Sequence, residues 1–185
     1  YLPDLKINIV ETGQTVELGD LKVKFWGVSH AIPDAMGIII ETPHGDIVHT
    51  GDLRLDHNDG IPTENEINNF SVFKGRKVLA LMTDSTNCEQ PGFSISDSVV
   101  YKNLEAVIRD TPGRLIVSTF ASQVERMLFM LRMCEKYGRK VVVEGRSMKT
   151  NIEVARMAEM LDVKPETLIP IEAVPDYPPN RIVIL

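Results

Sequence analysis

The sequence predicts an α/β protein with two lobes, a first lobe rich in β-hairpins and a second in which strands and helices alternate around a parallel sheet. Short apolar or β-branched runs, separated by turn residues, fill the first fifty positions. Beyond residue 77, apolar runs of strand length alternate with segments whose apolar residues recur at helical spacing. The chain of 185 residues is 43% hydrophobic and 25% charged, which suffices for one full core or parts of two.

The first lobe is expected to extend over residues 1–83 and to consist mainly of antiparallel strands. The strands are predicted at residues 6–10, 16–18, 21–28, 37–42 and 46–50. Turn sequences at 19–20 and 43–46 separate two pairs of these strands, which favours hairpins. Residues 53–77 are polar and irregular, with one short helix predicted near 63–70.

The second lobe is expected to extend over residues 84–185, after an apolar strand at 78–83. Further strands are predicted at 114–118, 140–144 and 181–185, and helices at about 96–109, from Ser122 onward, and at about 147–161. Ser122 and Glu125 have the spacing of a capping box. The residues expected on the buried helix faces are Val100, Leu104, Val107 and Ile108; Val124, Met127, Leu128 and Leu131; and Val154, Met157, Ala158 and Leu161. Strands that alternate with helices imply right-handed crossovers and a parallel sheet.

Charge is unevenly distributed along the chain. The formal net charge of −6 argues against uniform nonspecific binding to nucleic acid. Residues 109–149, however, contain nine basic and four acidic side chains. Such a basic segment is expected where one lobe contacts phosphates, and a solvated helix face is the alternative.

The cysteines and the chain ends bear on compartment and completeness. Cys88 and Cys134 form no Cys-x-x-Cys pattern, so neither a zinc knuckle nor a disulfide framework is predicted, and a cytoplasmic protein is expected. No apolar run is long enough for a membrane span, and the first residues lack the features of a signal peptide. The missing initial Met and the strand-like run at 181–185 predict that the chain is a fragment of a longer protein.

His30 and Asp52 are the candidate metal ligands. Each follows a strand-like run, 22–28 for His30 and 46–51 for Asp52, and strand ends present side chains into a shared cleft. In a two-metal site an aspartate can bridge both ions while a histidine holds one of them. Two donors are too few to define a site by themselves, so purely structural roles are the alternative.

The other three histidines are expected to serve other purposes. His49 would point to the face of its strand opposite Asp52, which favours a packing or supporting role. His44 lies in a turn and is expected to be solvated. His57 is expected to be a loop residue rather than a ligand.

Three strand-to-helix junctions carry small hydroxyl residues, Asp84-Ser85-Thr86, residues 118–122 and Gly145-Arg146-Ser147. If the strands are parallel, the junctions meet at one edge of the sheet, where helix N-termini and the guanidinium of Arg146 can hold an anion. Plain N-capping is the alternative, and it is favoured for Ser122. No junction has the spacing of a nucleotide-binding loop, and no nearby His supports a Ser-His-Asp hydrolase.

Five sequence blocks resemble, in order and spacing, those of the ribonuclease J family of metallo-β-lactamase-fold nucleases with an inserted β-CASP domain. The blocks are His30-Ala31-Ile32-Pro33-Asp34, His49-Thr50-Gly51-Asp52, Thr83-Asp84-Ser85-Thr86-Asn87, Thr119-Phe120-Ala121-Ser122 and Gly145-Arg146-Ser147-Met148. The resemblance runs from about residue 6 to residue 185. It implies that residues 1–83 are the end of a metallo-β-lactamase β-sandwich half and that residues 84–185 are part of a β-CASP domain.

The resemblance also implies roles for individual residues. His30 and Asp52 are similar to the third and fourth metal motifs of the family, with Asp52 bridging two zinc ions, and Asp84 is similar to the acidic residue of the first β-CASP motif. Hydroxyl and arginine side chains would hold the RNA backbone, namely Ser118, Ser122, Arg146 and Ser147. The family acts in RNA processing and decay as an endonuclease and as a 5′-to-3′ exonuclease, with a metal-bound hydroxide that attacks phosphorus.

Several family motifs are absent. The His-x-His-x-Asp-His motif would precede Tyr1, two later β-CASP histidine motifs would follow Leu185, and Glu125 stands where members often carry His. Because these motifs are absent, we expect this chain alone to be inactive.

From the resemblance, we expect the parent protein to be a zinc-dependent ribonuclease that can form homo-oligomers. A hydrolase of the same fold that acts on DNA or a small ester, and a noncatalytic binding or assembly module, are the alternatives.

Overall fold

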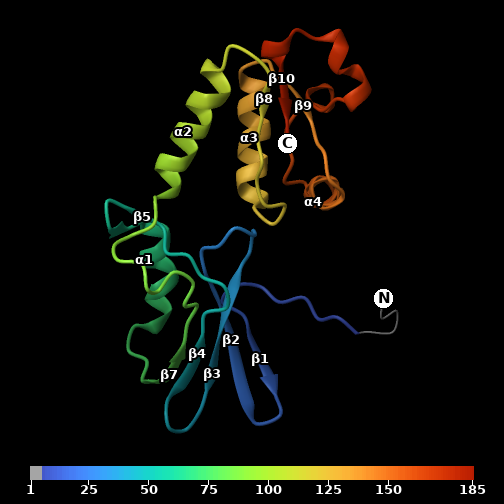
Figure 1. The fold of residues 1–185 in the computed structure, drawn as a ribbon. Coiled ribbons are helices and arrows are strands. Elements are labelled where there is room, and N and C mark those ends of the chain that lie inside the picture. The colour runs from blue at the N-terminus through green and yellow to red at the C-terminus, as the bar shows by residue number, and fades with distance from the viewer. Residues whose placement is uncertain (1–5) are drawn as a thin grey trace. The chain divides into compact units, whose positions relative to one another are not determined.

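The computed structural model describes residues 6–185, which fold into two compact units (Figure 1). The first unit comprises the chain up to His30 and residues Asp34–Ser94. The second comprises Ile95–Leu185, together with the short segment Ala31–Pro33. The first unit contains a mixed sheet and the second a parallel sheet with helices, which confirms the predicted α/β class.

The first unit is built around a five-stranded sheet. Its strands are β1 (Thr15–Leu18), β2 (Leu21–Gly27), β3 (Met36–Glu41), β4 (Asp46–His49) and β7 (Val78–Met82), in the order β1-β2-β3-β4-β7. The first four pair antiparallel in succession, so the hairpins that the turn residues predict are formed. β7 pairs parallel to β4, and the carboxyl ends of these two strands therefore lie at the same edge of the sheet.

The strand predicted at residues 6–10 is not formed. Pairing with β2 begins only at Gly13, whose N–H donates to the Phe25 carbonyl at 2.9 Å. Ile7 and Ile9 are exposed, so the apolar residues of this segment are not buried against a neighbouring strand. Alternation alone favours a strand, but a strand also needs a neighbour to pair with.

The core of the first unit surrounds Trp26 on β2. Its indole contacts Phe70 and Phe73 edge-to-face, with ring centroids 5.2 and 4.8 Å apart. These two rings come from helix α1 (Glu64–Phe70) and the 3-10 turn η1 (Ser71–Phe73). Trp26 also lies against Gly37 of β3, where a Cβ atom would come within 2.5 Å of the indole Nε1. A side chain at position 37 would therefore displace the indole.

An ionic cluster joins β3 and β4 to the segment before β7. The Arg76 guanidinium donates to Asp46 at 2.8 Å and to Glu41 at 3.0 Å. The Asp46 hydrogen bond is the main cause of a raised Arg76 pKa. The rest of this unit contains a two-stranded hairpin of β5 (His57–Asn58) and β6 (Ile61–Pro62).

The second unit contains the predicted parallel sheet. Its strands are β8 (Leu115–Ile116), β9 (Lys140–Val142) and β10 (Ile182–Ile184), in the order β8-β10-β9 with both pairings parallel. All three strands occur within the predicted ranges but are shorter. The last strand of the chain thus lies in the middle of the sheet (Figure 1).

Three helices and several 3-10 turns complete the second unit. The helices are α2 (Asp97–Asp110), α3 (Val124–Lys136) and α4 (Arg146–Met157), and the turns are η2 (Pro165–Thr167), η3 (Ile171–Asp176) and η4 (Pro179–Arg181). The main core joins helices to one face of the sheet through Ile108, Met127, Leu131, Val141, Ile152 and Val183. Val174 of η3 packs with Val142 of β9 and Ile182 of β10, and these three residues form a second, smaller cluster.

Two predictions about helices are wrong in detail. Gln123, not Ser122, occupies the N-cap position of α3, and the reciprocal bonds of a capping box are absent from the described residues. On α4 the buried residues are Met148, Ile152 and Ala155, whereas Val154 and Met157 are 56% and 85% exposed. This helix has two apolar stripes at helical spacing, and packing with α3 and β9 selects the one that begins at Met148.

The other helix predictions agree better with the structure. Met127, Leu128 and Leu131 of α3 are buried as predicted, and Ile108 of α2 is buried while Val107 is exposed. In the described part of the chain, no helix has the length and apolar character needed to cross a bilayer.

Candidate functional site

The predicted site residues of the first unit come from three segments that end strands. His30 follows β2, Asp52 follows β4 and Asp84 follows β7. Because β4 and β7 are parallel neighbours, the segments after them leave the same edge of the sheet, and the Thr50 N–H donates to the Met82 carbonyl at 3.0 Å. All three side chains line one pocket of about 720 Å³ within this unit.

His30 and Asp52 lie opposite one another in this pocket. His30 Nε2 is 3.9 Å from Asp52 Oδ2, and the two side chains are 31% and 85% exposed. The other ring nitrogen of His30, Nδ1, is buried and has no hydrogen-bond partner among the described residues. The pair therefore combines a partly buried imidazole with a carboxylate that is open to solvent and ligands.

Asp84 lines the same pocket and is held in place by backbone groups. Its Oδ1 accepts from the Thr86 N–H at 2.7 Å, and its Oδ2 accepts from the Leu53 N–H at 3.1 Å. These bonds, above all those from Thr86, lower the pKa of Asp84, and the nearby His30 lowers it further. Asp84 is thus an oriented carboxylate, and its bond to Leu53 also holds the backbone next to Asp52.

The donor chemistry of His30 and Asp52 fits a zinc ion. Zinc takes imidazole nitrogen and carboxylate oxygen at about 2.0–2.2 Å, so both atoms can reach one ion across their 3.9 Å separation. A complete zinc site has four ligands. Over residues 6–185, no group of three or more His, Cys, Asp or Glu side chains is placed to hold an ion.

His57 is a part of this pocket that the sequence does not reveal. Its Nδ1 accepts from the Gly60 N–H at 3.1 Å, its Nε2 lies 2.8 Å from the Ser94 carbonyl, and its ring lies 5.0 Å from that of Phe93. The residue is buried in β5, not in a free loop. It therefore ties the β5–β6 hairpin to the far end of the loop that starts at Asp84. Its position between Asp56 and Asn58 resembles a solvated loop, so no local signal indicates this contact.

The other two histidines lie outside the pocket lining. His49, expected to pack or support the site, is exposed, and its Nδ1 accepts from the Gly51 N–H at 2.8 Å. This bond shapes the turn that leads to Asp52. His44 is exposed in its turn, as the sequence predicts.

The predicted substrate residues lie in the second unit, at the carboxyl ends of β8 and β9. Ser118 and Ser122 are exposed in the loop between β8 and α3, and Arg146 and Ser147 are exposed at the start of α4. Asn151 of α4 donates from Nδ2 to the Ala121 carbonyl at 2.7 Å, so the two junctions are neighbours. The third predicted junction, at Asp84, belongs to the other sheet, because β7 pairs with β4. The expectation that all three junctions share one sheet is therefore wrong.

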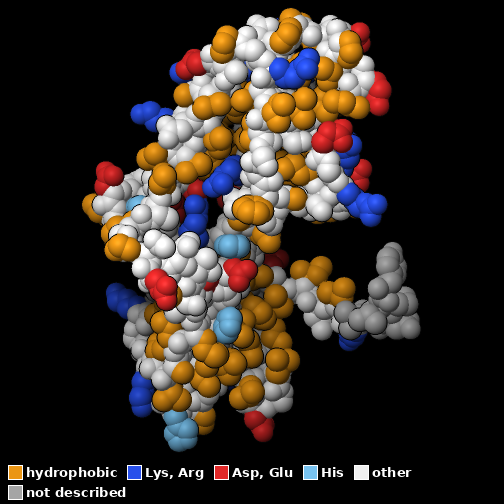
Figure 2. All heavy atoms as spheres, viewed as in Figure 1, with side chains coloured by type: hydrophobic (Ala, Val, Ile, Leu, Met, Phe, Trp, Pro, Cys, Tyr) orange, Lys and Arg blue, Asp and Glu red, His pale blue; other side chains and the backbone are white. Residues whose placement is uncertain are grey.

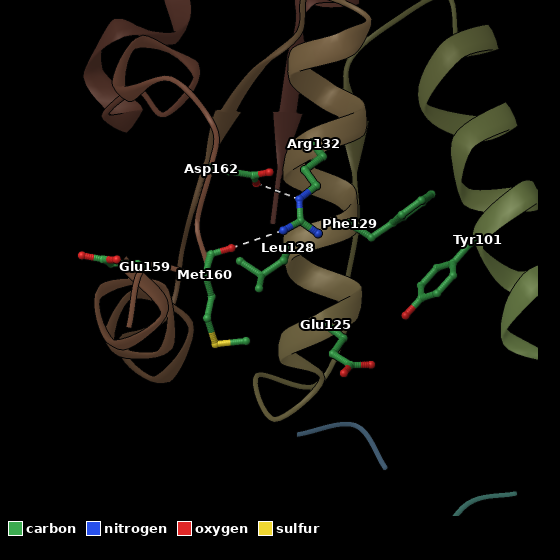
Figure 3. Close-up of a pocket in the computed structure, with 8 residues that line it drawn as sticks. All are labelled: Tyr101, Glu125, Leu128, Phe129, Arg132, Glu159, Met160 and Asp162. Carbon is green, nitrogen blue, oxygen red and sulfur yellow. Dashed lines mark hydrogen bonds and ion pairs between the residues drawn. The ribbon is translucent and has the colours of Figure 1, made fainter. Parts of the chain in front are cut away.

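Most of the basic side chains at 109–149 are engaged within the second unit. Arg132 donates to the Asp162 carboxylate at 2.7 Å and to the Met160 carbonyl at 3.2 Å (Figure 3). Arg139 is buried and donates to the backbone carbonyls of Thr111 and Gly113. Ion pairs also engage Arg109, Arg126, Lys136 and Lys149.

These contacts revise the prediction of a broad phosphate-binding segment. On the face drawn in Figure 2, the Lys and Arg side chains are scattered among acidic and apolar ones and form no continuous basic surface. Arg114 and Arg146 are exposed and lie outside the ion pairs described above. The local charge excess thus reduces to a few exposed cations, among them the predicted Arg146.

Comparison with known proteins identifies relatives for the whole chain. Residues 112–185 match the family model described as "Ribonuclease J, beta-CASP domain". The chain is 32% identical to ribonuclease J of Mycoplasma pneumoniae, over 97% of this chain and 32% of that protein. It is 40% identical to ribonuclease J of Thermus thermophilus, over 85% of this chain and 27% of that protein. The chain therefore spans about a third or less of the length of these relatives.

A solved structure shares the fold. A protein of unknown function from Enterococcus faecalis V583 superposes with a TM-score of 0.69 at 19% sequence identity, over 97% of this chain and 45% of that one. At this identity the likeness concerns the fold alone. The sequence relatives carry the assignment: the chain belongs to the ribonuclease J family.

Proposed function

We propose that the protein to which this chain belongs is a zinc-dependent ribonuclease that hydrolyses RNA phosphodiesters in RNA processing and decay, both internally and from the 5′ end. One observation carries the proposal: His30, Asp52 and Asp84, from three separate segments, line one pocket in a chain related to ribonuclease J. In this proposal the protein acts in the cytoplasm.

The proposal gives each of these three residues a distinct role. His30 Nε2 and Asp52 Oδ2 would be metal donors, and the high exposure of Asp52 suits a carboxylate that bridges two ions. Bound zinc would supply Lewis acidity and a nucleophilic oxygen at neutral pH. Asp84, ionised and bonded to the Leu53 N–H, would keep the segment that carries Asp52 in place.

RNA would be held by residues of the second unit. Ser118, Ser122 and Ser147 offer exposed hydroxyls, and Arg146 offers a planar donor that suits phosphate oxygens. In this proposal residues 1–83 form part of a metallo-β-lactamase domain and residues 84–185 part of a β-CASP domain. The residues of the first unit would then bind metal, and those of the second unit would bind RNA.

The test uses the full-length protein with Asp52→Asn, which removes a negative donor while keeping the size of the side chain. We expect cleavage of a labelled single-stranded RNA at saturating zinc to fall by about a hundredfold or more, because a metal ligand is lost. Calorimetry with zinc should show weaker binding. Asp20→Asn, in the exposed turn between β1 and β2, is the matched control and should leave both measurements unchanged.

The alternatives predict other outcomes. Undiminished cleavage by the Asp52→Asn variant would contradict the proposed role of Asp52 as a metal ligand. Equal cleavage of a DNA strand of the same sequence would favour a less selective hydrolase. A noncatalytic binding module is the remaining rival. RNA binding by the zinc-loaded protein without any cleavage would support that rival.

A further inference from the structure

We propose that Phe120 is a stacking platform for one base of single-stranded RNA, at the carboxyl edge of the β8-β10-β9 sheet. The inference rests on the proposed RNA function and deepens it, because it assigns recognition of a base to a residue outside the hydroxyl and arginine set. Aromatic side chains commonly bind unpaired bases in this way, since every base has a π face.

The exposure of Phe120 sets it apart from the other aromatic residues of the second unit. Its side chain is 79% exposed. Tyr101 and Phe129, which lie next to each other in Figure 3, stack with ring centroids 4.5 Å apart, and Tyr137 donates to Glu105 at 2.7 Å. Tyr177 lies beneath Lys140. Phe120 thus leaves a large apolar ring in water, and covering it with the face of a base would be favourable.

The backbone around Phe120 is held firmly on both sides. Before it, the Val117 N–H donates to the Ile184 carbonyl of β10 at 2.9 Å. After it, the Ala121 carbonyl accepts from Asn151 at 2.7 Å, and the carbonyl of Phe120 itself accepts from the Gln123 N–H at 3.0 Å. A ring on such a loop loses little conformational freedom when it binds a ligand, which favours affinity.

The neighbouring groups suit a nucleotide rather than a purely apolar ligand. Ser118 and Ser122 flank Phe120 in the loop, and both are exposed. Arg146 precedes Asn151 by a little over one helical turn on α4, and Asn151 contacts the loop directly. A base on the ring and a phosphate near Arg146 would use both kinds of group at once.

The decisive experiment compares RNA with a strand that lacks bases. Binding of a labelled oligouridine and of an abasic oligoribonucleotide of equal length is measured by fluorescence anisotropy, with the full-length protein in EDTA so that metal-dependent cleavage does not intervene. We expect Phe120→Ala to weaken oligouridine binding by about 5- to 150-fold, the range found for loss of one stacked base. Binding of the abasic strand should be the same for both proteins.

Two further variants keep the test informative. Phe120→Trp should bind oligouridine like the wild type, and its added fluorescence should be quenched by that strand but not by the abasic one. Trp26, the one tryptophan of this chain, is 2% exposed, so quenching in excess of that of the wild-type full-length protein reports on position 120. Met157→Ala is the matched control: it removes an exposed apolar side chain from α4 that cannot stack, and binding should not change.

The unfavourable outcomes are distinct. Unchanged oligouridine binding by Phe120→Ala would overturn the stacking role while leaving the ribonuclease proposal intact. An equal loss on both strands would show that Phe120 packs against protein and not against a base. If the wild type binds neither strand, the proposed RNA function itself fails, and the inference falls with it.

Discussion

At the scale of single residues, Asp84 shows how backbone groups prepare a carboxylate. The N–H groups of Leu53 and Thr86 both point at its oxygens, and they stabilise the charged form over the protonated one. The sequence indicates that Asp84 is special only through the resemblance to a family motif. It does not reveal that the partner of Asp84 is the residue after Asp52, because that contact depends on β7 pairing with β4.

Asp84 should make the first unit sensitive to acid. Its pKa is lowered below the ordinary 3.8, so its contribution to stability is present above that value and is lost as the pH falls through the folded-state pKa. We expect its carboxyl carbon to titrate below pH 3.8 in an NMR experiment. Asp84→Asn should be less stable than the wild type at pH 7, and the difference should shrink at about pH 3. Asp20→Asn serves as the control, and an equal stability difference at both pH values would contradict the role of the charge.

His57 marks the limit of prediction at this scale. Its burial depends on Ser94, thirty-seven residues away, and on the ring of Phe93. No periodicity in residues 56–60 encodes those partners. That His30 and Asp52 line a shared pocket could be expected from the sequence because each follows a strand, but their 3.9 Å separation is a result of the fold.

At the scale of secondary-structure elements, strands and helices were predictable where local signals agree with packing. The hairpins with turns at 19–20 and 43–46 formed, and α3 buries the predicted stripe. The strand at 6–10 and the buried stripe of α4 were not predictable. In both cases the apolar pattern is compatible with more than one arrangement. Which arrangement forms depends on whether the described chain provides a neighbouring element to pack against.

Helix caps give an element-scale prediction with an internal control. The Thr63 hydroxyl accepts from the Glu66 N–H at 3.4 Å at the start of α1, whereas Ser122 lies one residue before the N-cap of α3. Thr63→Ala should therefore lower the free energy of unfolding by about 1 kcal/mol, and Ser122→Ala should change it by less than about 0.5 kcal/mol. Urea denaturation followed by circular dichroism measures both. A larger loss for Ser122→Ala would mean that a capping box forms in solution.

At the scale of the whole molecule, the two units have separate cores, one around Trp26 and one around α3 and β10. The division into a hairpin-rich part and a parallel α/β part follows from sequence rhythm, because the period of the apolar residues changes near residue 77. The place of β7 in the first sheet does not follow from that rhythm. An apolar run by itself does not indicate which of the two sheets the strand will join.

Separate cores predict that a core mutation acts locally. Gly37→Ala would place a Cβ atom 2.5 Å from the indole of Trp26 and 2.7 Å from the His49 carbonyl, so it should destabilise the first unit by about 1–3 kcal/mol. Hydrogen exchange should rise in β2, β3 and β4 and stay unchanged in α3 and β10. Gly113→Ala, where an added methyl meets nothing within 4 Å, is the control. A uniform rise in both units would show that they unfold together.

The strand β7 has a consequence for how the chain behaves at high concentration. All five of its residues, Val78–Met82, are exposed, and the strand lies at the edge of its sheet. The run has no charge, proline or glycine, which is the composition of segments that stack into fibrils, and a free edge offers a template for them. The charged residues nearest to the strand, Lys77 before it and Asp84 after it, oppose such stacking. We therefore expect the loss of either charge to promote association of this chain through the edge of β7, although its overall charge of −6 would hardly change.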